Sequence, residues 1–320
     1  MATSSPQQAR LLLPLGVAVA LSLTGDQTLY AVLGNQASAV GIGLTAVGIL
    51  LAANRIIRIP GNLVAGALND RYRRRPLFLL GLCLGIVSTF SYAYVRGFAP
   101  FLASRLLWGA AWALINVTGY TMILDWSTQS DRGRMPGLYQ VAYALGLAVS
   151  PLLGGLLTDV VGFRSAVRFC AAISALGLVF AIVALPETKP PSAATRPGSR
   201  DLGLRVALRM LIGPLRAMDR RLWLAGYTYM VTFLVNSGVL MSTIGLYLQE
   251  RWGASITVSG LAIGVATLAG LMLALRASLG AIAGPAAGAL SDRLGERWPV
   301  VRGGLFIFPK DNLQVILFSS

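Results

Sequence analysis

One acidic residue lies deep inside an apolar segment, and it is the strongest candidate for chemistry in the chain. Of the twelve acidic residues, only Asp26 is far from the ends of the apolar segments. An ionisable side chain in such surroundings is costly and therefore marks a candidate functional site. A low dielectric favours the neutral form of a carboxyl group, which suits a residue that binds and releases a proton. The alternative is a structural carboxylate that is permanently paired with an arginine.

Several arginines lie at comparable depth. Arg105 is expected about one turn below the surface at which the fourth apolar segment begins, near the depth of Asp26, so it is the expected partner of Asp26. Otherwise its side chain snorkels to the nearer interface. Arg55 and Arg58 are three residues apart and share a helix face. They could bind an anionic group on a ligand, or pack against backbone carbonyl groups. Arg276 lies at a similar depth in a later segment.

Three further residues of the fourth apolar segment are candidates to line a ligand cavity. They are Trp108, Trp112 and Asn116, although the two tryptophans could simply be packing residues. Other chemistries are disfavoured. The chain has no histidine and its two cysteines lie inside apolar segments, so we expect no metal site, no disulfide and no cofactor. Without histidine or a pair of buried carboxylates, an enzyme is the weakest interpretation.

Composition indicates a protein that crosses a membrane several times. The chain is 55% hydrophobic and only 12% charged, and its mean hydropathy is +0.68, which exceeds what a soluble core requires. The net charge of +15 invites a nucleic-acid interpretation. However, most basic residues fall in alternate loops, and only Arg96, Arg164 and Arg251 fall in the opposite loops. This asymmetry follows the positive-inside rule and predicts a cytoplasmic N-terminus.

The apolar segments predict an all-α polytopic membrane protein, because no strand alternation is present. Each segment is long enough to cross a bilayer core of about 30 Å. We expect six spans at about 11–34, 41–69, 76–95, 99–124, 136–158 and 165–186, and two more at 223–247 and 257–290. This predicts an N-terminal half at 1–186, a cytoplasmic linker at 187–222 and a partial second half at 223–320. The stretch Leu204 to Leu215 predicts a basic amphipathic helix on anionic headgroups.

A loop motif occurs twice. Residues 66–76 read G-A-L-N-D-R-Y-R-R-R-P, and the pattern G-A-L-x-D-R recurs 222 residues later. The apolar context at 40–48 recurs at 262–270, so two copies of one membrane design indicate a transporter built from repeats. The motif resembles the loop between spans two and three of the major facilitator superfamily, although Arg73 replaces the usual glycine. The resemblance implies conformational-switch loops formed by Gly66, Asp70, Arg71, Arg74, Arg75, Gly288, Asp292 and Arg293.

Two other stretches resemble the drug/proton antiporter branch of that family. The sequence around Asp26 resembles its first-span motif, and the resemblance implies proton coupling through Asp26 and Arg105. The fifth span resembles the antiporter motif, in which small residues let helices approach closely and limit leak. Ser150 replaces one of its glycines, which weakens the assignment to efflux. The residues that match this motif are Gly146, Pro151, Gly154 and Gly155.

The resemblance implies twelve spans, whereas this chain offers eight and a broken ninth, so we expect it to be C-terminally truncated. It also implies a monomeric permease of the cell membrane that exports a small amphiphilic compound by alternating access, driven by protons. Its expected partners are therefore a small-molecule substrate, protons and the lipid bilayer, with no nucleic acid. The alternatives are a permease for uptake of organic anions, because arginines outnumber Asp26, and a gene product that transports nothing.

Overall fold

The computed structural model describes residues 6–128, 134–189, 241–258 and 261–294, together with isolated positions between 219 and 235. Side chains at 6–9, 242, 258, 261, 282 and 284–294 lie outside this description. So do the expected linker helix at 204–215, the residues after 294 and most of the expected seventh span. The chain divides after Ala274 into two compact units, and the end of the last helix belongs to the second unit.

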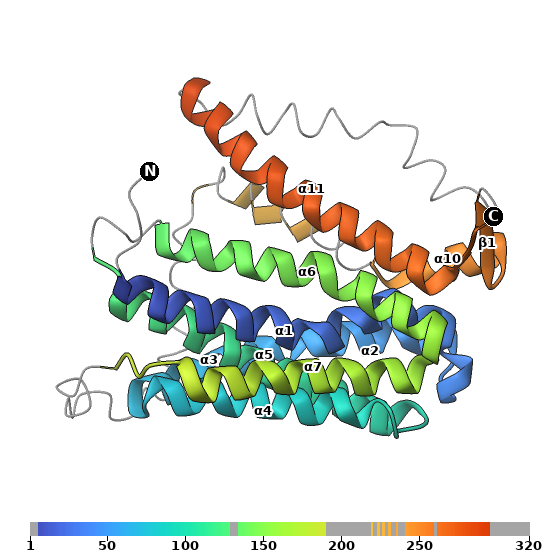
Figure 1. Ribbon diagram of the computed structural model, residues 1–320, viewed down its shortest axis with the longest axis horizontal. Coiled ribbons are helices and arrows are strands. Elements are labelled where there is room, and N and C mark those ends of the chain that lie inside the picture. The colour runs from blue at the N-terminus through green and yellow to red at the C-terminus, as the bar shows by residue number, and fades with distance from the viewer. Residues whose placement is uncertain are drawn as a thin grey trace. The chain divides into compact units, whose positions relative to one another are not determined.

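The first unit is built from long helices that run side by side (Figure 1). Within the described residues, six segments are long and apolar enough to cross a membrane, which confirms the six spans expected in the first half of the chain. The second span is bent at Ile57 into two helices. The helices are α1 Pro6–Gln36, α2 Leu44–Ile56, α3 Arg58–Arg71, α4 Arg74–Ser91, α5 Phe98–Trp126, α6 Arg134–Val161 and α7 Phe163–Ala184.

Glycines set the tight turns at which two of the helices begin. Gly97 precedes α5 and Gly162 precedes α7, and both have φ of 79°. A side chain at these positions would be strained, because L-residues other than glycine rarely adopt this region of φ. These turns therefore allow α4 and α5, and likewise α6 and α7, to lie antiparallel with short connections.

The interior of the bundle is organised around α1 and α5. Helix α1 packs along α6 and α7, whereas α5 packs against α2, α3 and α4. Small residues permit the close approach of α1 and α6, because a Cβ atom built on Gly146 would lie 2.9 Å from the backbone of Ala20. Asp26 and Arg105 lie on these two central helices, so the packing of α1 and α5 determines whether they meet.

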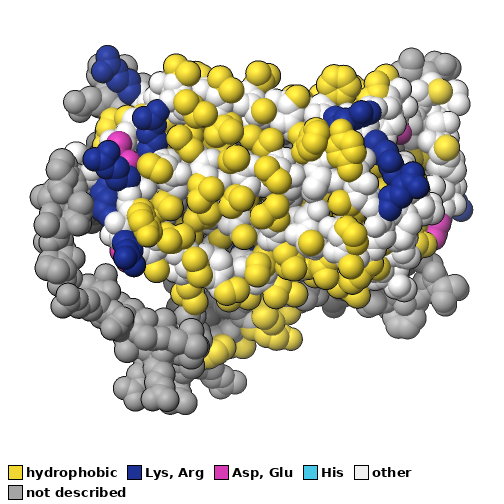
Figure 2. Space-filling model, turned by 90° about the horizontal axis from the view of Figure 1, so that it is seen from below, with side chains coloured by type: hydrophobic (Ala, Val, Ile, Leu, Met, Phe, Trp, Pro, Cys, Tyr) yellow, Lys and Arg dark blue, Asp and Glu magenta, His cyan; other side chains and the backbone are white. Residues whose placement is uncertain are grey.

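One face of the molecule is apolar between two charged ends. Figure 2 shows hydrophobic side chains across the middle of the face, with Lys and Arg side chains toward both ends. Large apolar side chains such as Val160, Leu176 and Val183 are exposed. Such an apolar zone is expected where a membrane protein contacts the hydrocarbon core of the bilayer.

The described part of the second half begins with α10 Met241–Trp252, which packs against α1. An antiparallel hairpin of β1 Ser255–Val258 and β2 Leu261–Gly264 follows. Then α11 extends over Val265–Leu294. The sequence predicted no strand and an eighth span from 257, so the hairpin is a local departure from the all-α prediction. Its first strand contains the β-branched run Ile256, Thr257 and Val258, which favours extended backbone.

Candidate functional site

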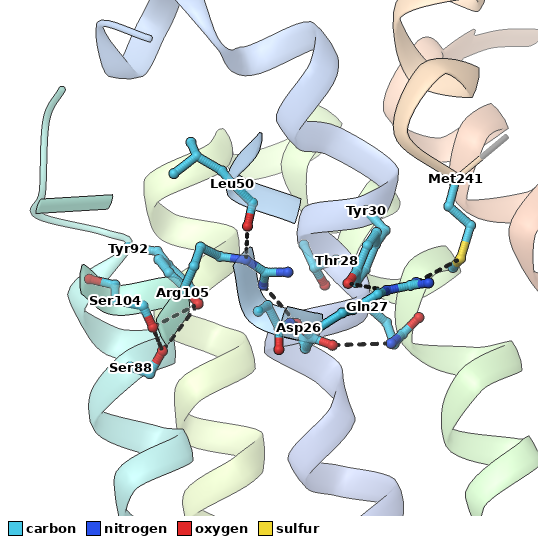
Figure 3. Close-up of polar contacts among 12 residues, drawn as sticks. Asp26, Gln27, Thr28, Tyr30, Leu50, Ser88, Tyr92, Ser104, Arg105 and Met241 are labelled. Carbon is cyan, nitrogen blue, oxygen red and sulfur yellow. Dashed lines mark hydrogen bonds and ion pairs between the residues drawn. The ribbon is translucent and has the colours of Figure 1, made fainter. Parts of the chain in front are cut away.

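The Asp26 carboxylate is buried in the centre of the bundle and is held on both oxygens (Figure 3). Its Oδ1 accepts hydrogen bonds from Arg105 Nη1 at 2.7 Å and from Asn54 Nδ2 at 2.8 Å. Its Oδ2 accepts one from Gln27 Nε2 at 3.3 Å and lies 3.7 Å from Arg58 Nη2. The structure thus joins Asp26 of α1 to polar side chains from α2, α3 and α5.

Arg105 is the second fully buried charge of the site. Its side chain is 0% exposed, which rules out the alternative in which Arg105 snorkels to the interface. Its Nε donates to the carbonyl oxygen of Leu50 at 3.3 Å, and its guanidinium carbon lies 5.3 Å from the ring centroid of Tyr30. Its Nη2 has no hydrogen-bond partner within the described ranges. Because two buried charges must compensate one another, Asp26 and Arg105 depend on each other for stability.

A small hydroxyl network fixes the part of α5 from which Arg105 projects. Ser88 Oγ donates to the carbonyl oxygen of Ser104 at 2.6 Å, and it lies 3.1 Å from the Tyr92 hydroxyl oxygen. The Tyr92 hydroxyl donates to the same carbonyl at 3.3 Å. The network therefore ties α4 to α5 one residue before Arg105. Sequence reasoning missed it, although Ser88 and Tyr92 share a helix face by their spacing of four residues.

Arg58 and Arg55 lie on either side of the bend between α2 and α3. Arg58 Nε and Nη2 donate to Asn54 Oδ1 at 3.2 and 3.0 Å, and the guanidinium lies over the ring of Trp112 at 5.4 Å. Arg55 Nε donates to the Tyr30 hydroxyl at 3.3 Å, and its Nη2 lies 3.9 Å from the Met241 sulfur. Both arginines therefore reach the same polar centre.

Asn54 is the central residue that the sequence did not reveal. Its Nδ2 donates to Asp26, and its Oδ1 accepts from Arg58. Its side chain is fully buried, so both ends of the amide are matched to opposite charges. The only sequence signal is a polar residue in mid-span beside Arg55. That signal could have placed Asn54 near the site, but not between Asp26 and Arg58.

The expected cavity residues have different surroundings. Trp108 is fully buried, and a Cβ built on Gly85 would lie 2.6 Å from its ring, so Trp108 packs between α5 and α4 and does not line a cavity. Trp112 lies under Arg58, and its ring centroid is 5.6 Å from that of Tyr143 on α6. Asn116 is partly exposed. Arg276 is in the part of α11 that belongs to the second unit, so its assignment to this cavity stays a prediction.

The antiporter-like motif forms a packing surface on two sides of α6. Gly146 and Gly154 face α1, where a Cβ on Gly154 would overlap Thr28. Gly155 faces the carbonyl oxygen of Ala266 at the start of α11. Pro151 lies inside α6, and a Cβ on Gly270 would overlap its carbonyl oxygen. The close approach that the sequence predicted for these small residues is therefore present, while a role in limiting leak stays a prediction.

The first loop motif is fastened by the segment that follows α7. Glu187 Oε1 and Oε2 accept hydrogen bonds from the backbone N–H groups of Arg74 and Arg75, at 3.1 and 3.2 Å. Lys189 Nζ donates to the carbonyl oxygens of Asn69, Asp70 and Tyr72, at 3.2, 2.6 and 3.1 Å. A carboxylate thus stabilises the N-terminus of α4, and an ammonium group stabilises the C-terminus of α3.

Other residues of the loop motif are less constrained. Arg74 is paired with Asp125 at 3.2 Å, and Arg75 donates to the carbonyl oxygen of Ile182. The side chains of Asp70 and Arg71 are exposed, and a Cβ on Gly66 would meet no heavy atom within 4 Å. In the second copy, Gly288, Asp292 and Arg293 lie within α11, but their side chains are outside the described part. The switching role of both loops stays a prediction.

Among the described residues, no cluster of His, Cys, Asp and Glu could hold a metal ion. The centre instead consists of one carboxylate among three guanidinium groups, within an apolar bundle. Such a centre can bind and release a proton or bind an anion, and either event would change the forces between α1, α2, α3 and α5.

Comparison with known proteins agrees with this description. The family model of the Major Facilitator Superfamily matches residues 15–309. The vesicular acetylcholine transporter of Mus musculus is 32% identical over 151 residues, which cover 47% of this chain and 28% of that protein. Citrate exporter 1 of Aspergillus niger is 29% identical over 128 residues, which cover 40% of this chain and 24% of the exporter. The chain therefore matches less than a third of the length of either relative.

A solved structure has the same fold. The human organic anion transporter MFSD10 superposes with a TM-score of 0.62 over 87% of this chain and 71% of that chain, at 24% sequence identity. Together with the six described segments that are long and apolar enough to cross a membrane, and with a family match over most of the sequence, this leads to one assignment. The chain belongs to the major facilitator superfamily of membrane transporters.

Proposed function

We propose that the chain works in proton-coupled secondary transport of a small amphiphilic compound, with Asp26 as the proton site and Arg105 as its partner. The observation that carries this proposal is the buried pair of Asp26 and Arg105, at 2.7 Å and with both side chains at most 1% exposed. A buried pair of this kind is costly to maintain, and a purely apolar contact would often be as stable. A charge-dependent step in transport would account for the presence of this pair.

The mechanism follows from what the carboxylate joins. When Asp26 is charged, it holds Arg105 of α5, Asn54 of α2 and Arg58 of α3 against α1. Protonation removes the negative charge and weakens all of these contacts together. The free energy of a given arrangement of the four helices therefore differs between the charged and the protonated state of Asp26. Alternating access would use that difference to open a central cavity to one side of the membrane and then to the other.

Export is the direction that we propose first. It is supported by the antiporter-like sequences around Asp26 and in α6, and by the similarity to a citrate exporter. The second candidate is uptake of an organic anion, and Arg55, Arg58 and Arg105 favour it because they outnumber the single buried acid. The loop charges support an orientation with the N-terminus in the cytoplasm of a cell membrane. We further propose that the permease acts as a monomer.

The test is solute movement in liposomes that contain the purified 320-residue chain. Radiolabelled citrate and acetylcholine are each supplied with an imposed pH gradient, and accumulation is compared with that of empty liposomes. We expect saturable accumulation of at least one of them, and its loss when a protonophore collapses the gradient. Accumulation that is unchanged without the gradient would contradict proton coupling. No saturable flux of either solute above empty liposomes would contradict the proposal for this chain.

A further inference from the structure

The buried centre carries an excess of positive charge. Two arginines, Arg58 and Arg105, contact the single Asp26 carboxylate. No other acidic residue of the sequence lies in the middle of an apolar segment. The formal charge of this group is therefore positive whether Asp26 is charged or protonated. In a bilayer interior such an excess is unfavourable unless an anion balances it for at least part of the working cycle.

Arg58 offers the hydrogen-bond donors for such an anion. Two of its nitrogens, Nε and Nη2, are engaged by Asn54. Its third nitrogen, Nη1, makes no hydrogen bond with the described residues, and 24% of the side chain is exposed. Arg105, in contrast, is fully enclosed. The Arg58 guanidinium can therefore bind a ligand while the ion pair between Asp26 and Arg105 stays intact.

Aromatic side chains lie directly beside this donor. The Arg58 guanidinium lies over the Trp112 ring, and Trp112 is tilted by 32° against Tyr143 from the neighbouring helix. Tyr143 and Asn116 are partly exposed. Asn116 is one turn along α5 from Trp112 and makes no hydrogen bond with the described residues. Tyr143 therefore offers an aromatic ring next to the Trp112 ring on which Arg58 lies, and Asn116 offers an amide one helical turn from Trp112.

We propose that this site binds an organic anion with an aromatic body, held by Arg58 and Asn116 and packed on Tyr143 beside Trp112. This inference rests on the proposed transport function, and it names the substrate class of the same centre. A cationic substrate is disfavoured because the Asp26 carboxylate is already occupied on both oxygens. A cation would also face the surplus positive charge of the arginines.

The experiment measures equilibrium binding of three probes of similar size to the purified full chain in lipid nanodiscs, with no pH gradient. Benzenesulfonate is the anion, benzenesulfonamide is its neutral counterpart, and benzyltrimethylammonium is the cation. We expect benzenesulfonate to bind at least about tenfold more tightly than either of the others, because a charge-assisted hydrogen bond in a low dielectric is worth about that factor. Equal binding of the three probes, preference for the cation, or no binding of benzenesulfonate would overturn the proposal.

Variants locate the binding site. Arg58→Gln should weaken benzenesulfonate binding about tenfold or more, and Arg58→Lys should fall between it and the parent because lysine keeps the charge without the fork. The matched control is Arg168→Gln, an exposed arginine of α7, which should leave binding unchanged. Circular dichroism and size-exclusion chromatography check the fold of each variant. If Arg58→Gln does not fold, Arg58→Lys and the probe preference of the parent still decide the question.

The outcomes separate this inference from the proposed function. Tight and Arg58-dependent binding of benzenesulfonate without any proton-driven flux would support the anion site and contradict proton coupling. Proton-driven flux in a protein that does not prefer the anion would overturn the anion site alone. An unchanged affinity in a folded Arg58→Gln variant would also overturn it.

Discussion

Asp26 and Arg105 should be strongly coupled in their effect on stability. Each side chain is at most 1% exposed, and the two are joined at 2.7 Å. Removing one partner of a buried pair costs about 3–5 kcal/mol, because the other charge stays buried without compensation. For a unit of this size, 1 kcal/mol corresponds to about 2–4 °C in Tm. Asp26→Asn and Arg105→Gln should therefore each lower Tm by roughly 6–20 °C.

The two single variants should not be equal. In Arg105→Gln, Asp26 keeps Asn54, Gln27 and Arg58 as partners. In Asp26→Asn, two arginines face one another with no anion between them, so this variant should be the less stable. The double variant should be more stable than the sum of the single losses predicts, by about 1–3 kcal/mol, since neither charge is then left without its partner.

The measurement is a double-mutant cycle on thermal unfolding of the detergent-solubilised protein. The pair Arg74 and Asp125, at 3.2 Å with side chains 11% and 18% exposed, provides a comparison nearer to solvent. Its coupling should be smaller, because water screens it more strongly. Losses at Asp26 and Arg105 that add to within about 0.5 kcal/mol would refute the claim that the two charges act as a unit.

Three further predictions follow from other contacts. Gly154→Ala should lower Tm because the added methyl group would overlap Thr28. Gly48→Ala is the control and should leave Tm unchanged, because its methyl group meets no atom within 4 Å. Equal effects of the two variants would show that α1 and α6 tolerate separation. Glu187→Ala should speed amide hydrogen exchange at the start of α4, and Lys189→Ala should speed it at the end of α3. Unchanged exchange rates would show that these caps do not stabilise the helix ends. The affinity for benzenesulfonate should differ between the parent and Asp26→Asn, because the ligand shares Arg58 with the Asp26 carboxylate; equal affinity in the two proteins would contradict this linkage.

The sign of that difference also distinguishes the two candidate directions, because Asp26→Asn mimics the protonated carboxyl group. If proton binding strengthens anion binding, the two ligands favour the same state of the protein and would travel together. This linkage supports the uptake candidate. If the two compete, the exchange expected of an antiporter is favoured.

The first six spans and the position of the central pair could be predicted from the sequence, because the spans depend on segment length and the pair depends on depth in the membrane. A run of about 20 apolar residues crosses a bilayer wherever it occurs. The rise of a helix then places Asp26 and Arg105 at similar heights. Height alone was enough to expect their contact, because a lone buried carboxylate needs a basic partner.

The contacts that depend on helix rotation could not be predicted. Asn54 bridges Asp26 and Arg58 only because of how α2 is rotated against α1. Trp108 and Trp112 are one turn apart on α5, yet Trp108 is enclosed because Gly85 of α4 faces it. The caps formed by Glu187 and Lys189 join segments more than 100 residues apart in sequence. No periodicity of a single helix encodes such contacts.

The most direct test of proton coupling at Asp26 is the internal pH of liposomes that contain the full chain, followed with an enclosed pH-sensitive dye when a transported solute is added. The parent protein should move protons whenever it moves the solute, in the same direction or in the opposite one. Asp26→Asn should move none, while it still exchanges labelled for unlabelled solute across the membrane at equal concentrations. Proton movement by Asp26→Asn at the rate of the parent would contradict the central role of this carboxylate.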